Sequence, residues 1–354
     1  MHYATITGWG KCLPPATLTN DDLATFIDTS DEWIKPRTGI SQRHISHVNT
    51  SELASVAAKR ALAAAGIDGS EIDMIILATA TPDTLIPNIA STVQANIGAN
   101  CAAFDINAAC SGFLYGVGLA SAQIQSGQSK KVLVIGAERL SFFIDWSRRE
   151  TAVLFGDGAG AVILEATDQP IGVLGYELNN DPAGRDILKS EFGTSMDRFE
   201  ASSLDFYIEF NGKEIFKRAI AGMGKLSNKV IEKCGIEKDD IDWVIPHQAN
   251  ERIIDTLINR MKIPKEKAIV NIANYGNTSA ATIPIAICDA LEQGKIKPNQ
   301  TILSCAFGAG LTSAAALIKW GDRVTPINNS NAELPPCDKT GIELVSKAVK
   351  HFCK

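Results

Sequence analysis

An internal repeat restricts the fold of this chain more than any other feature of its sequence. A helix expected over residues 53–65 ends at Gly66, and a helix expected over residues 226–234 ends at Gly235, 169 positions later. Each glycine is followed by a short loop and an apolar strand. A helix, a terminal glycine and an apolar strand make an α-β unit, so the chain holds the same unit in both halves.

A second unit repeats further along each half. Helices expected over residues 111–125 and 278–292 both end just before a glycine, and the two glycines lie 167 positions apart. At that offset Cys110 is the counterpart of Asn277. Both residues are then expected where a strand and a tight turn lead into the N-terminus of a helix.

The two repeated halves predict a five-layered α/β/α/β/α fold, because parallel strands need helices on both faces of their sheet. The two helices of the second unit are rich in small residues and nearly uncharged, which is typical of helices buried on all sides. We therefore expect them to lie between the two sheets. The predicted divisions are an N-terminal half over residues 1–168, a C-terminal half over residues 169–321, and a linker with a short amphipathic helix over residues 322–354.

The composition excludes several classes of protein. The 354 residues carry a formal net charge of −6, which argues against nucleic-acid binding by a basic surface. The N-terminus lacks a signal-peptide pattern, and no apolar run reaches the roughly 18 residues of a membrane span. The segment FGDGAGA continues into a strand instead of a helix, so it does not predict a dinucleotide site. The eight cysteines form no CxxC pair and are expected to be free thiols of a cytoplasmic protein.

Three polar residues in apolar surroundings are the candidate catalytic residues: Cys110, His247 and Asn277. Cys110 lies at an expected helix N-terminus, where free backbone N–H groups and the helix dipole favour a thiolate. The dipole lowers a thiol pKa by at most ~1.5 units, so a nearby imidazole is expected to supply the rest. Each residue also has a plainer interpretation, as a core thiol, a hydrogen-bonded histidine at a strand end and a helix N-cap. Their occurrence at equivalent edges of the repeated units favours a shared site.

The segments around these residues resemble the β-ketoacyl-acyl carrier protein synthase III family of thiolase-fold condensing enzymes. The resemblance covers about residues 3–321. Its motifs are DINAACSGF at Cys110, PHQAN at His247 and NYGNTSAAT at Asn277, together with DTSDEWI, FGDGAGA and FGAGLT. Thiolases carry a second catalytic cysteine where this chain reads FGAG, and elongating ketosynthases carry a second histidine where it has the asparagine.

The resemblance implies an acyltransferase that works through an acyl-cysteine intermediate. An acyl group passes from coenzyme A to Cys110, with the backbone N–H groups of Cys110 and Ala309 as the oxyanion hole. Malonyl-acyl carrier protein then loses CO2, and His247 and Asn277 hold the enolate oxygen while the carbanion attacks the acyl thioester. Acyl-CoA and malonyl-acyl carrier protein are substrates, and neither a cofactor nor a metal ion is expected. The resemblance also implies a homodimer.

The substrate-binding residues are assigned by the same resemblance. Trp33 and Arg149 are expected to enclose the coenzyme A adenine, with Arg37 near the phosphates. An alternative for Trp33 is a partly exposed core aromatic. Ile86, at the acyl pocket, and Phe307 are also assigned to substrate binding. Ile86 stands where a common family form has a Phe that blocks the pocket across the dimer interface, so a longer or branched primer is expected to fit.

The resemblance also implies that Arg252 helps to dock the carrier protein. On a helix it could lie beside Lys213 and Lys217, with Arg218, in a basic patch for an acidic carrier protein. The alternative is an ordinary solvated helix face. Three functions remain open at this point: initiation of fatty-acid synthesis with a primer as long as medium-chain, a specialised condensing enzyme of secondary metabolism, and a non-catalytic acyl-carrier-binding homologue. The intact cysteine, histidine and asparagine argue against the third.

Overall fold

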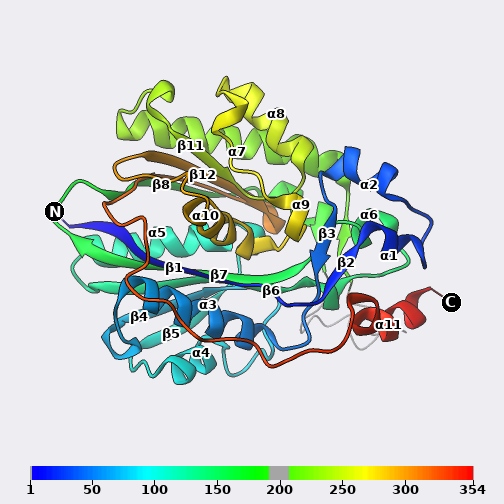
Figure 1. Ribbon diagram of the computed structural model, residues 1–354. Helices are drawn as coiled ribbons and strands as arrows, with labels where there is room; N and C mark the ends of the chain where they lie inside the picture. Colours follow the sequence, from blue (N-terminus) through cyan, green and yellow to red (C-terminus); the bar gives the residue numbers. More distant parts are fainter. Residues whose placement is uncertain (1, 191–206, 354) are drawn as a thin grey trace.

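Two β-sheets form the framework of the protein (Figure 1). The computed structural model describes residues 2–190 and 207–353. The first sheet contains, in spatial order, β1 (Tyr3–Cys12), β7 (Asp157–Thr167), β6 (Lys131–Arg139), β4 (Met74–Ala78) and β5 (Ala102–Ile106). β4 runs parallel to β5 and β6, whereas β7 is antiparallel to both of its neighbours.

The second sheet repeats this order with four strands: β8 (Gly172–Asn180), β13 (Thr312–Lys319), β12 (Thr301–Gly308) and β11 (Trp243–Pro246). β11 and β12 are parallel, and the other two pairs are antiparallel. A single parallel bridge between Val244 and Ala268 stands where the first sheet has β5. The two sheets are therefore copies of one arrangement that differ at one edge.

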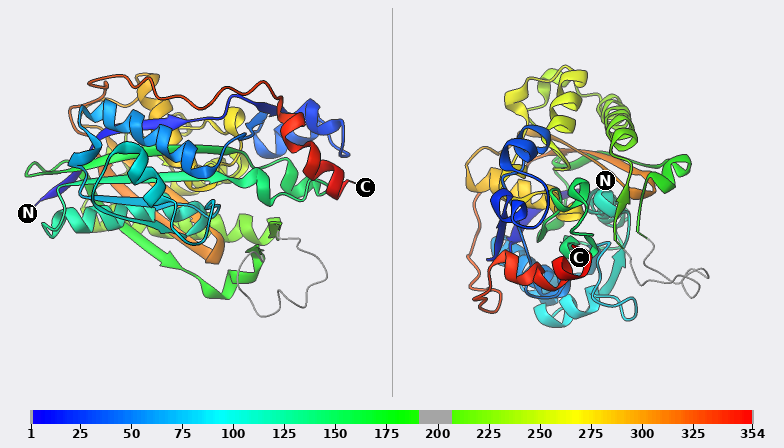
Figure 2. Two further views of the ribbon diagram at one scale, coloured as in Figure 1. Left: turned by 90° about the horizontal axis from the view of Figure 1, so that it is seen from below. Right: turned by 90° about the vertical axis from the view of Figure 1, so that its right-hand side faces the viewer.

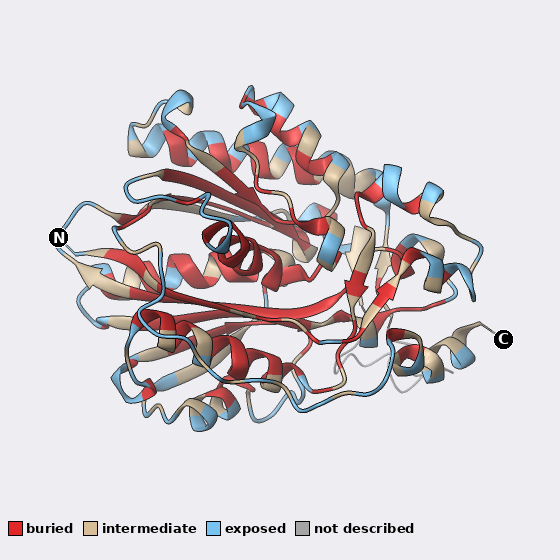
Figure 3. Ribbon diagram, viewed as in Figure 1, coloured by how far each residue is buried: buried red, intermediate tan, exposed pale blue. Residues whose placement is uncertain are grey.

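Helices cover both faces of both sheets, as Figures 1 and 2 show. α3 (Thr50–Ala65) and α4 (Ala90–Ile97) pack on the outside of the first sheet, and α7 (Gly212–Cys234) and α8 (Glu251–Met261) on the outside of the second. α5 (Gly112–Gln125) and α10 (Thr282–Glu292) lie between the sheets. Every residue of α10 from Thr282 to Leu291 is buried, as Figure 3 shows. The predicted five-layered fold is confirmed.

Short elements gather at one end of the molecule, beside the C-terminus (Figure 1). They are β2 (Thr17–Thr19), α1 (Asn20–Ala24), α2 (Asp31–Thr38), β3 (Gln42–His44), α6 (Arg149–Ala152), β9 (Leu188–Lys189), β10 (Glu209–Phe210), α9 (Ile272–Tyr275) and α11 (Gly341–Phe352). α11 is the amphipathic helix expected at the C-terminus, and its apolar face packs against this end of the core. Among the described helices, none has both the length and the hydrophobicity to span a lipid bilayer.

The repeat has a different register from the predicted one at the central helices. α5 and α10 each follow a short 3-10 turn, which covers Ala109–Ser111 in one half and Ser279–Ala281 in the other. The first residue of each turn has a left-handed backbone, with φ of 47° at Ala109 and 49° at Ser279. The two turns are therefore equivalent, and they lie 170 positions apart.

This register pairs Cys110 with Ala280, and it pairs Asn107 with Asn277. The expected pairing of Cys110 with Asn277 is wrong. α10 has 11 residues and α5 has 14, so the glycines that end the two helices lie three positions out of register with the turns that begin them. Alignment of the helix ends therefore misplaces the helix starts.

Candidate active site

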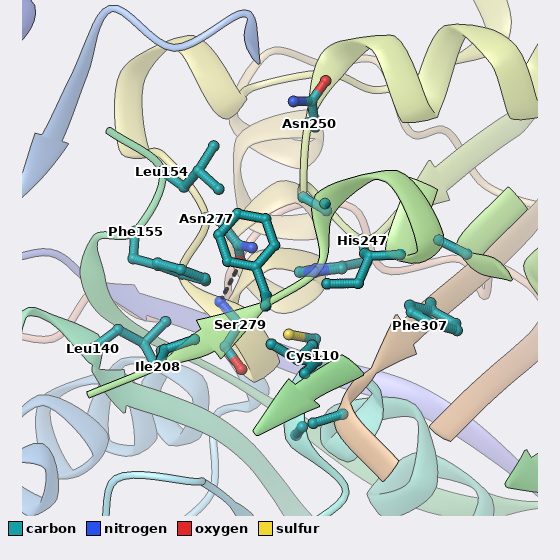
Figure 4. A pocket seen from close by; sticks show the side chains of 18 of the residues that line it. Cys110, Leu140, Leu154, Phe155, Ile208, His247, Asn250, Asn277, Ser279 and Phe307 are labelled. Atoms are coloured by element: carbon teal, nitrogen blue, oxygen red, sulfur yellow. Dashed lines mark hydrogen bonds between the residues drawn. The ribbon is translucent and has the colours of Figure 1, made fainter. Parts of the chain in front are cut away.

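Cys110, His247 and Asn277 open into one cavity of about 530 Å³ (Figure 4). Its lining comes from both halves and is largely apolar, with Leu140, Phe155, Ile208 and Phe307 among the lining residues. Figure 4 shows the three polar side chains gathered in one part of this cavity. The structure therefore brings the three residues together, and their catalytic roles stay predictions.

Cys110 lies in the tight turn directly before α5. The Oδ1 atom of Asn107 accepts a hydrogen bond from the Ala109 N–H (3.1 Å), which stabilises the left-handed turn. Gly308, at the end of β12, lies against this turn, because a Cβ atom there would be 2.7 Å from the backbone N of Cys110. The next residue, Ala309, lines the cavity. The turn and the strand end thus adjoin each other, as a two-donor oxyanion hole requires.

The electrostatic surroundings of Cys110 differ from the expected ones. Burial raises the pKa of the thiol to about 12; a hydrogen bond with Ser279 lowers it, and the nearby Glu138 carboxylate raises it. Burial lowers the pKa of His247 to about 3, so this imidazole is neutral near pH 7. A helix dipole worth ~1.5 pKa units at most does not offset the burial of the thiol. The neutral imidazole carries no positive charge that could stabilise a thiolate, and the expectation that it supplies the rest of the stabilisation stays a prediction.

His247 follows β11, and its backbone N–H donates a hydrogen bond to the Cys305 carbonyl (2.8 Å). The ring Nδ1 lies 2.7 Å from Oγ1 of Thr282, the first residue of α10. When the Thr282 hydroxyl donates to Nδ1, the proton of the neutral ring is on Nε2, which can then donate to a substrate oxygen. The hydroxyl also lies 3.0 Å from the Ser279 carbonyl, which accepts the backbone N–H of Thr282 as well. The Thr282 hydroxyl can therefore donate its proton to the imidazole instead of to the Ser279 carbonyl, because that carbonyl still accepts the backbone N–H.

Asn277 is held by its backbone and by its side chain. Its N–H donates to the Leu154 carbonyl (2.8 Å), and its carbonyl accepts the Gly156 N–H (3.1 Å). Its Oδ1 accepts the Ser279 N–H (2.8 Å), as the dashed line in Figure 4 shows. Since Oδ1 is engaged, Nδ2 is the group that can donate to a substrate. Nε2 of His247 and Nδ2 of Asn277 can thus offer two neutral donors to one oxygen.

Sequence reasoning missed a buried carboxylate beside this site. Glu138, at the C-terminal end of β6, is 0% exposed, and its Oε1 accepts a hydrogen bond from the Ser279 hydroxyl (3.0 Å). Ser279 and Thr282 were also not singled out. Both stand in the NYGNTSAAT segment, and Glu138 ends the apolar run KVLVIGAE. A charged residue at the end of such a run is the signal that could have found it, because acids are seldom fully buried without partners.

The residues expected to bind coenzyme A surround a tryptophan. Trp33 and Arg37 line the cavity. The guanidinium carbons of Arg149 and Arg37 lie 4.3 Å and 4.7 Å from the centre of the Trp33 ring. Arg149 also donates a hydrogen bond to the Asp28 carbonyl (2.9 Å). Because Arg149 itself stacks on the ring, an adenine can enter between Trp33 and Arg149 only if the arginine side chain moves away.

The other two residues expected to bind substrate, Ile86 and Phe307, are placed differently. Phe307 lines the cavity. Ile86 lies in an exposed loop, is 89% exposed, and is not part of the cavity lining formed by its own chain. Among the described residues, no cluster of histidine, cysteine and acidic side chains could hold a metal ion.

The residues expected to bind the carrier protein lie on two outer helices. Lys213 and Lys217 of α7 and Arg252 of α8 are exposed. Both helices also contribute residues to the lining of the cavity. Arg218 forms an ion pair with Asp181 (2.7 Å), so it does not offer a free charge to the expected patch.

Comparison with known proteins gives consistent results. Residues 104–182 match the family of 3-oxoacyl-[acyl-carrier-protein] synthase III, and residues 231–320 match the C-terminal part of that family. The chain is 60% identical to β-ketoacyl-[acyl-carrier-protein] synthase III 2 of Vibrio cholerae, over 99% of this chain and 98% of that protein. It is 46% identical to β-ketoacyl-[acyl-carrier-protein] synthase III of Geobacillus kaustophilus, over 90% of this chain and 99% of that protein.

The crystal structure of 3-oxoacyl-[acyl-carrier-protein] synthase III from Aquifex aeolicus has the same fold. The match has a TM-score of 0.85 at 44% sequence identity and covers 90% of this chain and 100% of that one. A cysteine, a neutral histidine and an asparagine in one apolar cavity agree with the chemistry of condensing acyltransferases. By its sequence, its fold and this cavity, the chain belongs to the β-ketoacyl-acyl carrier protein synthase III family.

Proposed function

We propose that the protein joins an acyl group from acyl-CoA to malonyl-acyl carrier protein, with loss of CO2, and so initiates fatty-acid synthesis. The observation that supports this most strongly is the meeting of Cys110, His247 and Asn277 in a largely apolar cavity. The two neutral donors suit an enolate, because a charged imidazolium would be acidic enough to protonate the carbanion. The specialised condensing enzyme remains the alternative, and it differs only in its substrates.

In the first half-reaction, the sulfur of Cys110 attacks the thioester carbonyl of acyl-CoA. The carbonyl oxygen becomes an oxyanion, which the N–H groups of Cys110 and Ala309 stabilise in this proposal. One such donor contributes about 2.7–4 kcal/mol to a transition state. The C–S bond to coenzyme A then breaks, and the acyl group stays on Cys110 as a thioester.

In the second half-reaction, malonyl-acyl carrier protein loses CO2 and becomes an enolate. Nε2–H of His247 and Nδ2–H of Asn277 hold the enolate oxygen while the carbon attacks the acyl thioester. The Cys110 thiolate is expelled, and the β-ketoacyl-acyl carrier protein leaves. The apolar walls of the cavity keep water from the carbanion, which would otherwise be protonated before it reacts.

The test is to follow both half-reactions separately. Incubation with acyl-CoA is expected to add one acyl mass to the protein, and Cys110→Ser is expected to abolish the addition. A panel of primers with malonyl-acyl carrier protein, read by product mass, then identifies the product. If the wild-type protein takes no acyl group from any acyl-CoA, the proposed function is wrong.

The primer is proposed to reach medium-chain length. Ile86 is smaller than the Phe of the common family form, and its 89% exposure leaves it available to a second subunit of the proposed homodimer. Ile86→Phe is then expected to lower turnover with octanoyl-CoA and to leave turnover with acetyl-CoA. If the wild-type protein prefers acetyl-CoA, this part of the proposal fails.

The acidic carrier protein is proposed to dock on Lys213, Lys217 and Arg252. These exposed cations lie on helices that line the cavity, which suits delivery of a tethered substrate. Arg252→Glu is expected to raise KM for malonyl-acyl carrier protein several-fold without slowing acylation by acyl-CoA. Lys225→Glu is the matched control, since Lys225 is an exposed residue of α7 about two turns beyond Lys217.

We also propose that the protein acts in the cytoplasm. All eight cysteines are free, which suits a reducing compartment.

A further inference from the structure

The proposed half-reactions leave Glu138, the buried acid beside the site, without a role. Glu138 is 0% exposed and accepts hydrogen bonds from the hydroxyls of Thr81 (2.6 Å) and Ser279 (3.0 Å) and from the Ala80 N–H (3.1 Å). Thr79 offers a fourth, longer bond (3.3 Å). All four donors are neutral. Burial raises the pKa of Glu138 to about 7, although these hydrogen bonds favour its ionised form.

The fold brings Ser279 to this acid by a close approach between the two halves. A Cβ atom at Gly136 of β6 would lie 2.2 Å from the Ala280 carbonyl oxygen, so only a glycine lets the 3-10 turn come this near. Gly136 and Glu138 lie two residues apart and so share one face of β6. The turn that rests on Gly136 therefore carries the Ser279 hydroxyl to the carboxylate.

Ser279 lies beside the nucleophile, since both residues line the same cavity and the two 3-10 turns that hold them contact each other. The Ser279 side chain favours the thiolate of Cys110, while the nearby Glu138 carboxylate disfavours it. Ser279 is 3% exposed, and its left-handed backbone (φ 49°) is held by the Asn277 side chain. The hydroxyl is thus fixed between a thiol and a carboxylate.

We propose that Glu138 takes the thiol proton of Cys110 through the Ser279 hydroxyl during acylation, and returns it when the thiolate is expelled. The proposal rests on the acyl-Cys110 intermediate of the proposed function. Ser279 Oγ–H donates its proton to Oε1 of Glu138, and Ser279 Oγ accepts the proton of the Cys110 S–H bond. The products are a thiolate, a neutral carboxylic acid and an intact hydroxyl, which now donates to the thiolate. Ser279 exchanges a proton with the reacting sulfur, whereas Glu138 acts on Cys110 only through Ser279 and is a positioning residue.

The relay conserves the number of buried charges. Loss of the thiol proton to solvent would leave two anions, Cys110 and Glu138, close together in the protein interior, which is costly in both desolvation and repulsion. Transfer to Glu138 moves one negative charge from oxygen to sulfur and creates no second one. In the acyl-enzyme the sulfur is bonded to the acyl carbon and Glu138 is neutral. The developing enolate then meets no buried carboxylate charge.

The pH dependence of two reactions tests the relay. The first is acylation by acyl-CoA, and the second is alkylation of Cys110 by iodoacetamide, which needs no acyl substrate. In the wild type both rates are expected to rise up to about pH 7, where Glu138 ionises and can accept the proton, and then to level off. In Glu138→Gln the levelling is expected to disappear, so that the rates keep rising about tenfold per pH unit. At pH 7.5 acylation is expected to be about 100-fold slower than in the wild type.

The direction of the change separates the relay from simple repulsion. If Glu138 only repelled the thiolate, its removal would make Cys110 more reactive at neutral pH, and Glu138→Gln would be faster than the wild type. Ser279→Ala keeps the Glu138 carboxylate but removes the hydroxyl through which the proton passes from Cys110. It is also expected to slow acylation. Either a faster Glu138→Gln or an unchanged Ser279→Ala would overturn the proposal.

Asp157→Asn is the matched control. Asp157 is another fully buried carboxylate, bound to the N–H groups of Ser46 (2.7 Å) and Ser141 (2.9 Å), and burial raises its pKa too. Its removal is expected to leave the levelling near pH 7 in place. If the wild type is never acylated but its alkylation profile levels off, the proposed function fails, and only the transfer of the Cys110 proton to Glu138 stands. If acylation occurs without the levelling, the relay fails and the proposed function stands.

Discussion

Thr282→Val tests whether one hydroxyl decides which ring nitrogen of His247 carries the proton. Valine keeps the shape and the β-branching of threonine at the start of α10, and it removes only the group 2.7 Å from Nδ1. His247 is 2% exposed. The Ser279 carbonyl keeps the backbone N–H of residue 282. The substitution therefore leaves one buried polar atom unpaired.

The expected loss of stability follows from the unpaired Nδ1 atom of His247. An unpaired buried donor or acceptor costs about 1–3 kcal/mol, and the free energy of unfolding is expected to fall by that amount. The chemical effect is separate. Without a donor at Nδ1, the ring no longer favours the tautomer with the proton on Nε2, and the enolate loses one of its two donors. Loss of one such donor costs about 100–1,000-fold in rate.

Two assays measure the two effects. Urea unfolding gives the change in stability, and the slope m should stay constant because the substitution does not change the surface exposed on unfolding. Condensation is measured by mixing pre-acylated enzyme with malonyl-acyl carrier protein, and acylation is measured separately with acyl-CoA. Condensation is expected to fall 100-fold or more, whereas acylation is expected to change by only a few-fold.

Thr278→Val is the control. Thr278 is 1% exposed, and its hydroxyl has no hydrogen-bond partner within the described part of the chain. Its replacement is expected to leave stability equal or slightly higher, and both half-reactions unchanged. If Thr282→Val behaves like Thr278→Val in both assays, the argument for the tautomer is wrong.

Three further predictions concern the same cavity. Asn277→Asp keeps an acceptor for the Ser279 N–H (2.8 Å) but removes the Nδ2 donor, so condensation is expected to fall while self-acylation continues. Unchanged condensation would refute the role of Asn277. Gly308→Ala puts a Cβ atom 2.7 Å from the Cys110 backbone N, and the rate of acyl-mass gain is expected to fall about 100-fold or more. If Gly308→Ala gains acyl mass at the wild-type rate, the end of β12 is not part of the oxyanion hole. Because burial lowers the pKa of His247 from 6.5 to about 3, the unfolded chain gains a proton below pH 6.5 that the folded protein does not, and stability falls on acidification. His247→Gln is expected to reduce the loss of unfolding free energy between pH 7 and pH 5 by about 2 kcal/mol, and equal losses in both proteins would contradict the burial.

Local patterns were enough to predict the layers and the helices that carry the site. The apolar runs of β4, β6 and β12 and the uncharged central helices follow from short-range sequence alone. α7 was expected only over residues 226–234, and the structure extends it back to Gly212. Its N-terminal part is amphipathic with several charges, so its apolar positions are less evident in the sequence than those of a buried helix.

The burial of Glu138 and the neutral form of His247 depend on contacts that the sequence does not reveal. Glu138 is buried because the turn at Ser279 rests on β6, and these residues lie 141 positions apart in the chain. The shift of His247 to a neutral imidazole likewise comes from burial by the assembled fold. The register of the repeat was missed for another reason. Glycine ends both central helices, so the sequence shows where they stop but not that α10 is shorter.

Each half of the chain contributes contacts to the part of the site that lies in the other half, and this has a consequence for the biosynthesis of the protein. Glu138, in the first half, meets the turn at Ser279 in the second, and Gly308, in the second half, meets the turn at Cys110 in the first. The half that carries Cys110 leaves the ribosome first. At that moment its thiol has neither the proposed donor at Ala309 nor the hydroxyl of Ser279. On the proposed mechanism, a nascent chain therefore takes no acyl group from coenzyme A efficiently, and acylation begins only after synthesis of the second half is complete.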